Sequence, residues 1–368
     1  MALSNFLIPV LSVVSLYYLT TTINPTSASP KHDSKVTNFT VRVPDIKPER
    51  TEQYLCTAQR VPPSKVGHYV VGVDPVANVN YVHHMLIYGC QLPGVQRRDT
   101  PNLTWECGSM QARGDLEDGA ESKYINGPVC DPEGEEQLMY GWALEAPGLK
   151  MPKGVGYKIG GDTDLNYIVI QVHYGNVHKF QELPDLTDNS GLILETKPAG
   201  PNSGITKRAG VLLLFSYGYV ETGKSRHEVW CQIEEDIVIH PFKYRVHTHR
   251  LGTKVYGAKI GNSRNKYPYK RKTENNDLII GQGNPQKPNM FYEVKNKNLT
   301  LTQGDSVYAY CDYYNPTTKE VVIGPKATDE MCNYYVLYWT ESSKLLDKKI
   351  CPQRNPSLAR SLYTLLQY

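Results

Sequence analysis

The stretch YRVHTHRL at residues 244–251 brings two imidazoles and a guanidinium together. On a β-strand, alternate side chains share a face, so Arg245, His247 and His249 would project together. Two histidines in this i, i+2 arrangement can hold one metal ion. The arginine beside them can hold an anionic group next to that metal. This stretch therefore predicts a metal site with an adjoining anion clamp.

The first half of the chain offers further nitrogen ligands. In YVHHMLIYGC at residues 81–90, His83 and His84 would point to opposite faces of a regular strand. They could share one metal only if the backbone bulges there. In YIVIQVHYG at residues 167–175, one alternating face is apolar and reads as core. His173 lies on the other face, beside Gln171, and is available as a ligand.

The second half adds a sulfur ligand. In DEMCNYYVLYW at residues 329–339, Met331, Asn333 and Tyr335 would share one strand face. A thioether is a soft ligand that favours Cu(I) and is a poor choice for zinc, calcium or magnesium. Two histidines with Met331 in one half, and three histidines in the other, would make two copper sites of different softness.

Two unequal copper sites have a chemical use. Insertion of one oxygen atom of O2 into a C–H bond requires two electrons from outside the substrate, and each copper supplies one at a time. The softer site would hold reduced copper and bind O2 beside Arg245. The three-histidine site would relay electrons.

The composition favours strands over helices. The chain has 368 residues, 21% of them charged, with 29 Gly, 25 Pro and 27 Tyr. Short alternating runs separated by turn residues predict an all-β protein. The linker-like segment KPAGPNSG at residues 197–204 suggests two domains, over 36–199 and 200–355. The tail at 356–368 is either loosely ordered or a docking helix. A net charge of +3 is too small to indicate nucleic acid.

The N-terminal region predicts export. The apolar run FLIPVLSVVSLYYL at residues 6–19 is typical of a signal peptide, with cleavage near residue 29. A basic segment before it is missing, so a short N-terminal anchor is the alternative. No later run is long enough to span a membrane. We expect a secreted protein, or one of the secretory lumen.

The cysteines agree with an oxidising compartment. There are eight, and they lack the close spacing of a zinc site. They predict four disulfides, although eight cysteines allow about 105 pairings and the sequence alone does not choose one. Four precede residue 131 and four follow residue 230, as expected for two separately crosslinked domains. Asn38, Asn102 and Asn298 stand in glycosylation sequons.

The motifs HHMLIYGC, QVHYG, YRVHTHRLG and DEMCNYYVLYW, in this order, resemble one family. It is the ascorbate-dependent copper type II monooxygenases, and within it the peptidylglycine α-hydroxylating monooxygenases. The resemblance runs over residues 41–351 and includes TEQYLC, PKGVGYKIGG and an NPQ segment. It implies two β-sandwich, jelly-roll-like domains that face each other across a cleft, with one copper on each.

The resemblance also implies roles for single residues. The electron-transfer copper would be bound by His83, His84 and His173. The copper where O2 reacts would be bound by His247, His249 and Met331. The C-terminal carboxylate of a glycine-extended peptide would pair with Arg245 and Tyr335, and Asn333 would contact the peptide backbone. The implied reaction is hydroxylation of the glycine α-carbon with O2 and ascorbate, the first step of peptide amidation.

The implied disulfides are Cys56–Cys107, Cys90–Cys130, Cys231–Cys351 and Cys311–Cys332. Three departures from the family stand out. Asn189 replaces a cysteine of a further disulfide, whose N-terminal partner is also absent. Arg250 replaces a frequent histidine. The chain ends soon after the second domain, so we expect no lyase domain and a separate lyase that completes amidation.

Other functions are weaker. A related copper monooxygenase could act on a small amine or alcohol, but such a substrate has no use for Arg245. A non-catalytic secreted copper-binding protein would not need every ligand position. A zinc hydrolase lacks a suitably spaced carboxylate base. Among the remaining histidines, we expect His32, His68, His178 and His227 in loop-like or surface stretches and His240 as a structural hydrogen-bonding group.

Overall fold

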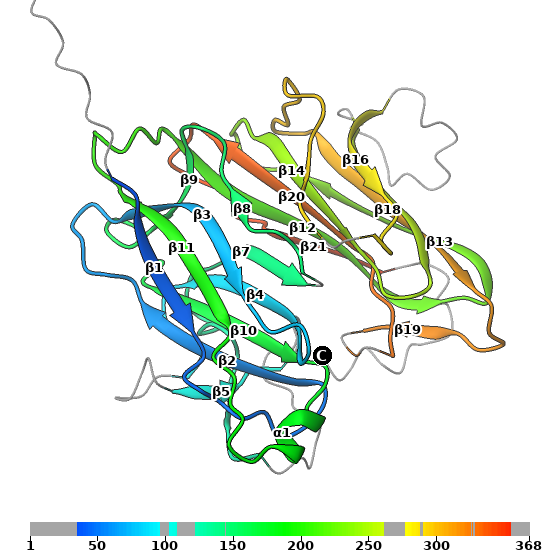
Figure 1. Ribbon diagram of the computed structural model, residues 1–368. Helices are drawn as coiled ribbons and strands as arrows, with labels where there is room; N and C mark the ends of the chain where they lie inside the picture. The colour runs from blue at the N-terminus through cyan, green and yellow to red at the C-terminus, as the bar shows by residue number, and fades with distance from the viewer. Residues whose placement is uncertain are drawn as a thin grey trace, which may run out of the picture. The chain divides into compact units, whose positions relative to one another are not determined.

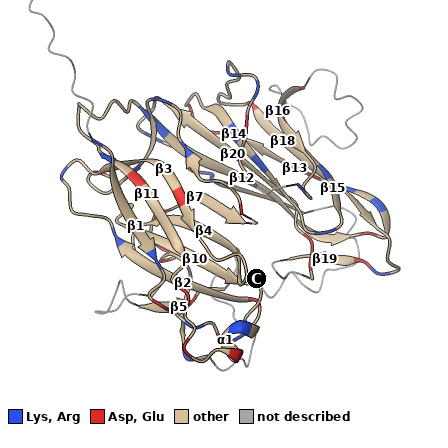
Figure 2. Cartoon of the chain, in the orientation of Figure 1, with Lys and Arg blue, Asp and Glu red and all other residues tan. Residues whose placement is uncertain are grey.

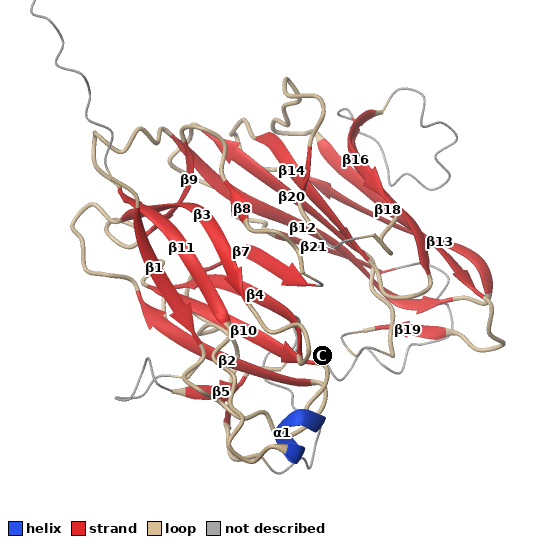
Figure 3. Cartoon of the chain, in the orientation of Figure 1, coloured by secondary structure: helices blue, strands red, loops and turns tan. Residues whose placement is uncertain are grey.

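The computed structural model describes residues 35–95, 103–108, 122–143, 145–260, 277–287, 290–324, 326 and 328–354. The expected signal segment 1–29, the sequon at Asn102 and the tail 356–368 lie outside these residues. Strands dominate the described chain, and its helix α1 (His178–Glu182) has five residues (Figure 3). The expectation of an all-β protein is confirmed.

The first half is a sandwich of two layers. One layer runs in the order β1 (Thr37–Arg42), β11 (Gly191–Pro198), β3 (His68–Val76) and β9 (Val155–Ile159), with β8 (Leu149–Lys150) beside β3. The other runs in the order β6 (Ile125–Asn126), β5 (Thr104–Glu106), β2 (Gln53–Arg60), β10 (Tyr167–Tyr174), β4 (Val82–Cys90) and β7 (Glu136–Ala143). Figure 1 shows β1, β11 and β3 side by side.

The second half is also a sandwich. One layer runs in the order β12 (Lys207–Val220), β20 (Asn333–Thr340), β14 (His240–His247) and β17 (Tyr292–Glu293), with β19 (Val321–Ile323) and β21 (Ile350–Arg354) paired to β12. The other runs in the order β13 (Gly223–Gln232), β18 (Ser306–Asn315), β15 (Gly252–Ile260) and β16 (Leu278–Gly283). The expected pair of β-sandwiches is therefore confirmed.

The two sandwiches share one layer. Val155 and Gly156 of β9 pair in parallel with Lys207 and Arg208 of β12, so the strands form one eleven-stranded sheet. Residues 199–206, most of the expected linker, connect β11 to β12. The junction is thus a backbone ladder as well as a covalent connection.

Strand alternation divides the buried side chains of β20 between two cores. Tyr334 and Val336 pack in the core of the second sandwich. Tyr335 and Leu337 point the other way and pack with the core of the first sandwich. Since Arg245 of β14 pairs with Tyr335, this layer presents the predicted anion clamp on the face turned toward the first half.

Four disulfides crosslink the described chain, two in each half. They are Cys56–Cys107, Cys90–Cys130, Cys231–Cys351 and Cys311–Cys332, the same pairs that the resemblance implies. Figure 2 shows acidic and basic residues interspersed along the strands. Among the described residues, no helix has the length and apolar character needed to cross a bilayer.

The expectation for His227 is wrong. It lies on β13 and is fully buried, with Nδ1 3.2 Å from the Ser216 hydroxyl oxygen. Alternation along β13 places it on the inward face with Val229 and Cys231. The surrounding sequence, GKSRHE, is polar because Lys224 and Arg226 lie on the exposed face of β13, so the sequence does not reveal that His227 is buried. His178 opens α1, and His240 opens β14 and stacks on Trp339.

Candidate metal centres

Three histidines of the first sandwich converge on one point. The Nδ1 atoms of His83, His84 and His173 are 3.2–3.3 Å apart. A bulge in β4 makes this possible, because His173 of β10 pairs with His84 while the next residue, Tyr174, pairs with Val82. His83 is therefore the extra residue, and both neighbouring imidazoles reach the same side. The bulge is the distortion that the His-His sequence requires.

The cluster fits a metal ion. Imidazole–metal bonds of about 2 Å place tetrahedral ligand atoms about 3.3 Å apart, which matches the nitrogen separations. Burial, followed by the charges of neighbouring histidines, lowers the pKa of His84 well below its ordinary value and also lowers the pKa of His83. Neutral imidazoles have the free lone pair that a metal needs.

Two residues of TEQYLC support His173. Its Nε2 lies 3.1 Å from a carboxylate oxygen of Glu52, and its ring stacks on Tyr54 with centroids 4.1 Å apart. Tyr54 of β2 is the cross-strand partner of His173. This motif is part of the family resemblance, but the sequence predicted no role for Glu52 or Tyr54. Only the pairing of β2 with β10 reveals that they meet His173.

The second candidate ligand set lies where β14 ends and the neighbouring strand β20 begins. Their register places Arg245 opposite Tyr335 and His247 opposite Asn333. The next residues in line on the same face are His249 and Met331, just beyond the strand ends. The rings of His247 and His249 have centroids 5.3 Å apart.

The donor groups of this set are held in place by neighbours. Asn333 Nδ2 is 3.6 Å from the sulfur of Met331, which is buried, and 3.3 Å from the Tyr335 hydroxyl. His249 Nδ1 is 2.8 Å from the Asp329 carbonyl oxygen. Nδ1 therefore donates its hydrogen, and Nε2 is left with a lone pair for a metal. Two imidazoles and a thioether suit Cu(I).

A carboxylate that sequence reasoning missed fixes the turn after β14. Glu330 is fully buried, and its two oxygens accept the backbone N–H groups of His249, at 3.0 Å, and Leu251, at 2.7 Å. On the other side of the turn, Gln286 donates to the carbonyl oxygens of His249 and Gly252. Gln286 belongs to the NPQ segment. Partners 81 and 37 residues away thus hold the turn.

Arg245 is a buried cation beside this set. It is 5% exposed, and Nη1 donates to the carbonyl oxygen of Gly141 on β7 at 3.0 Å. The guanidinium also lies 5.4 Å from the ring centroid of Tyr335 and 5.9 Å from that of Phe291. Burial lowers the pKa of Arg245. A desolvated guanidinium among aromatic rings attracts a carboxylate strongly.

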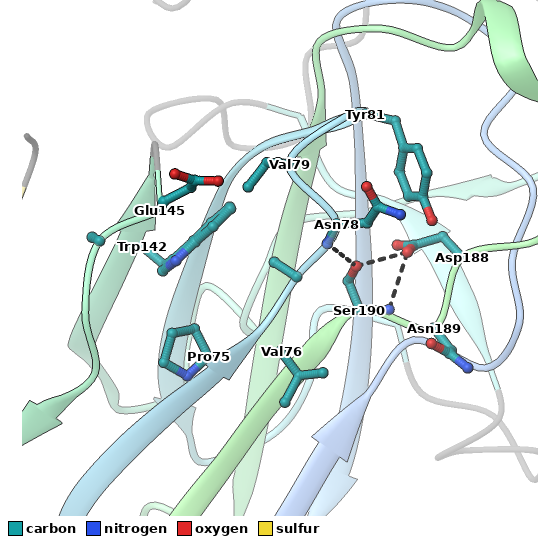
Figure 4. A pocket seen from close by; sticks show the side chains of 12 residues that line it. Pro75, Val76, Asn78, Val79, Tyr81, Trp142, Glu145, Asp188, Asn189 and Ser190 are labelled. Carbon is teal, nitrogen blue, oxygen red and sulfur yellow. Dashed lines mark hydrogen bonds between the residues drawn. The ribbon is translucent and has the colours of Figure 1, made fainter.

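One hollow of the first sandwich contains none of these groups. It measures about 590 Å³ and is lined by residues of β3, the turn before β4, the end of β7 and residues 188–190 (Figure 4). Asp188 and Ser190 are hydrogen-bonded to each other there, beside Asn189. We assign no role to this hollow.

The fold and the two donor sets define a class of protein, a double β-sandwich with one cluster of three imidazoles and one set that adds a softer thioether to two imidazoles. Comparison with family profiles identifies the family. The profile of the N-terminal domain of the copper type II ascorbate-dependent monooxygenases matches residues 39–181, and that of their C-terminal domain matches residues 207–362. The chain belongs to this family.

Curated relatives fall into two groups. Peptidyl-glycine alpha-amidating monooxygenase A of Xenopus laevis is 30% identical over 85% of this chain and 29% of its own length. The Rattus norvegicus peptidylglycine alpha-amidating monooxygenase is 30% identical over 88% of this chain and 29% of its own. DBH-like monooxygenase protein 1 of Homo sapiens is 25% identical over 79% of this chain and 45% of its own.

The chain therefore spans less than a third of the amidating relatives and less than half of the DBH-like one. Among solved structures, a chain of the cryo-EM structure of Broad Bean Stain Virus aligns with this protein, over 89% of this chain and 94% of the viral chain. Its TM-score of 0.25 and identity of 7% are too low to support any conclusion.

Proposed function

We propose that this protein hydroxylates the α-carbon of the terminal glycine in peptides that end in glycine, using copper, O2 and ascorbate. The observation that carries the substrate assignment is Arg245. It is a buried cation on the same strand face as His247, and its guanidinium lies 5.4 Å from the ring centroid of Tyr335. Similarity to amidating monooxygenases over 85–88% of the chain supports the same substrate.

The substrate carboxylate would bind at Arg245. Tyr335 would donate a second hydrogen bond, since burial raises the pKa of its hydroxyl and keeps it protonated. Asn333, between Tyr335 and Met331, would contact the peptide backbone. Held at its carboxylate, the glycine would present its α-carbon toward the histidine and methionine ligands.

The reaction inserts one oxygen atom of O2 into the glycine C–H bond and reduces the other to water. It consumes two electrons and two protons, and ascorbate supplies the electrons one at a time. The product is an α-hydroxyglycine peptide, and a lyase activity would then release the amide.

The two donor sets would divide the redox work. His83, His84 and His173 would hold the electron-transfer copper, and His247, His249 and Met331 would hold the copper where O2 reacts. When bound, copper supplies single-electron transfer and dioxygen binding. Burial lowers the pKa of His83, His84 and His247, which favours their neutral imidazoles, and burial excludes water from Arg245. We propose one copper on each sandwich, with a cleft between them for substrate.

A monooxygenase acting on a small amine or alcohol is the second candidate, because DBH-like proteins are also relatives. Such a substrate has no carboxylate to offer a guanidinium, so Arg245 discriminates between the two. A non-catalytic copper protein would bind copper and turn over neither substrate.

We also place the protein in the secretory lumen or outside the cell. Four disulfides and exposed sequons at Asn38 and Asn298 support that compartment.

Copper stoichiometry, measured with ascorbate-dependent oxygen uptake on a dansylated peptide ending in glycine, tests the function. We expect two coppers per chain and peptide-dependent formation of the hydroxyglycine product. Copper binding with turnover of an amine or alcohol would instead support the second candidate. Absence of copper binding would refute both.

The substrate assignment has its own test in Arg245→Ala. Removing one member of a buried charged pair costs about 2–5 kcal/mol, so kcat/KM for the peptide should fall by roughly 30-fold or more. Arg42→Ala, which removes an exposed arginine of β1, is the matched control and should leave kcat/KM unchanged. Wild-type kinetics in Arg245→Ala would show that Arg245 does not bind the peptide carboxylate and would remove the observation on which the substrate assignment rests.

A further inference from the structure

Glu52 has an unusual backbone. Among the described residues, three that are not glycine have positive φ: Asp45 at 47°, Glu52 at 63° and Glu145 at 55°. An L-residue with a long side chain is strained in this left-handed region, whereas glycine is not. Such strain persists only where the surrounding structure enforces it, and it is concentrated at functional sites. A glutamate at this position therefore suggests that its side chain has a role, because glycine would fit the backbone conformation without strain.

The backbone contact of Glu52 fixes where its side chain begins. Its N–H donates to the carbonyl oxygen of Tyr174 at 2.9 Å. Tyr174 directly follows His173, at the point where the register between β10 and β4 shifts. The left-handed turn therefore sits beside the candidate metal centre, and the Glu52 side chain leaves it toward His173.

The Glu52 carboxylate completes the support of the His173 ring. An oxygen of Glu52 lies 3.1 Å from Nε2, on the opposite edge of the ring from the Nδ1 atom that faces His83 and His84. Tyr54 stacks on the ring face with an interplanar angle of 4°. The ring is 1% exposed. Stacking sets the plane of the ring, and the carboxylate selects which nitrogen points inward.

We infer that Glu52 is a positioning residue for the three-histidine centre, kept in a strained conformation because its carboxylate fixes the tautomer and orientation of His173. The inference rests on the proposed metal role of the three histidines. A carboxylate that accepts the Nε2–H makes Nδ1 a stronger donor to a metal. Stronger donation favours the more oxidised ion, so Glu52 lowers the reduction potential of bound copper.

Opposite effects of one substitution on two properties make the inference testable. Glu52→Gly removes both the strain and the carboxylate. We expect the Tm of the metal-free protein to stay the same or rise, while Cu(I) affinity at the three-histidine centre falls about 10–100-fold. A role in folding alone would not separate these two properties.

The control is matched in residue type and in φ. Glu145 is an exposed glutamate in the same conformation, near the end of β7, and neither donor set includes it. Glu145→Gly should change the Tm in the same direction and leave Cu(I) affinity within about twofold. All variants are compared in a His247→Ala, His249→Ala background, so that the titration of Cu(I) against a competing chelator reports on one centre.

Glu52→Gln decides the matter if Glu52→Gly does not fold, since it keeps the backbone conformation and the shape. We expect a more positive reduction potential and a several-fold lower Cu(I) affinity. In the metal-free protein, nitrogen NMR shifts should show that His173 no longer holds one tautomer. Wild-type affinity in Glu52→Gly, or wild-type potential and tautomer in Glu52→Gln, would overturn the inference. Because no peptide is used, failure of the peptide assignment would leave this result intact.

Discussion

At the scale of single residues, the proposed carboxylate contact of Arg245 depends on a glycine, Gly141. Arg245 reaches the carbonyl oxygen of Gly141, and a Cβ added at Gly141 would collide with the end of the guanidinium and with Leu86. Both obstacles are the far ends of flexible side chains. The fold can therefore accept a methyl group there, but the guanidinium must move.

Gly141→Ala should separate binding from stability. We expect the KM for a glycine-extended peptide to rise several-fold, because a displaced Arg245 meets the carboxylate poorly, with a Tm within a few degrees of wild type. Steady-state kinetics and thermal unfolding measure the two effects. The control is Gly200→Ala, where an added Cβ meets nothing within 4 Å. An unchanged KM in Gly141→Ala would argue against Arg245 as the carboxylate contact.

At the scale of elements, sequence alternation identified much of the candidate site. Period-two patterning grouped Arg245 with His247 on β14 and put His173 on the face opposite the apolar core, as the structure has them. The His-His pair demanded a bulge, and β4 contains one. Alternation predicts which side chains share a face of one strand, but it does not predict which other segments of the chain lie beside that strand. Glu52 and Glu330 were missed because they meet their histidines 121 and 81 positions away.

Glu330→Gln tests how the turn after β14 is held. An amide can accept through one atom only, so its NH2 group would face the N–H of His249 or Leu251 and leave a buried donor unsatisfied. We expect unfolding free energy to fall by about 1–3 kcal/mol and amide exchange at His249 and Leu251 to accelerate. Urea unfolding and hydrogen exchange measure these effects. Glu320→Gln, an exposed glutamate before β19, should change neither.

At the scale of the whole molecule, a buried histidine links stability to pH. Burial lowers the pKa of His227 to about 4, against 6.5 for the unfolded chain. Between about pH 6.5 and pH 4, His227 is therefore protonated in the unfolded chain but neutral in the folded protein. The contribution of this group to stability is fully present above pH 6.5 and is lost as pH falls through that interval. The loss is about 3 kcal/mol at most.

His227→Gln should flatten this dependence. We expect the variant to lose less unfolding free energy than wild type between pH 7 and pH 4.5, measured by urea denaturation at each pH. His178→Gln, on the exposed surface of α1, should keep the wild-type slope. Equal slopes in His227→Gln and wild type would mean that other groups set the acid sensitivity.

The all-β, two-domain organisation followed from composition and periodicity, and the resemblance to the family implied the two sandwiches, but two features of the whole molecule followed from neither. The parallel pairing of β9 with β12 involves two residues on each strand, too few to leave a periodic signal. His227 lies in a polar stretch, and only the register of β13 with β18 shows that its face is inward. Both depend on which strands become neighbours.

The bulge at His83 makes the three-histidine candidate centre sensitive to the number of residues in β4 as well as to their identity. Deleting one residue between Tyr81 and His83 could restore an unbroken ladder with β10, and in that ladder the two imidazoles would point to opposite faces. Every ligand would still be present in such a sequence, yet the centre could not assemble. When distant relatives are aligned, the count of residues across this segment is therefore as informative about copper binding as the histidines themselves.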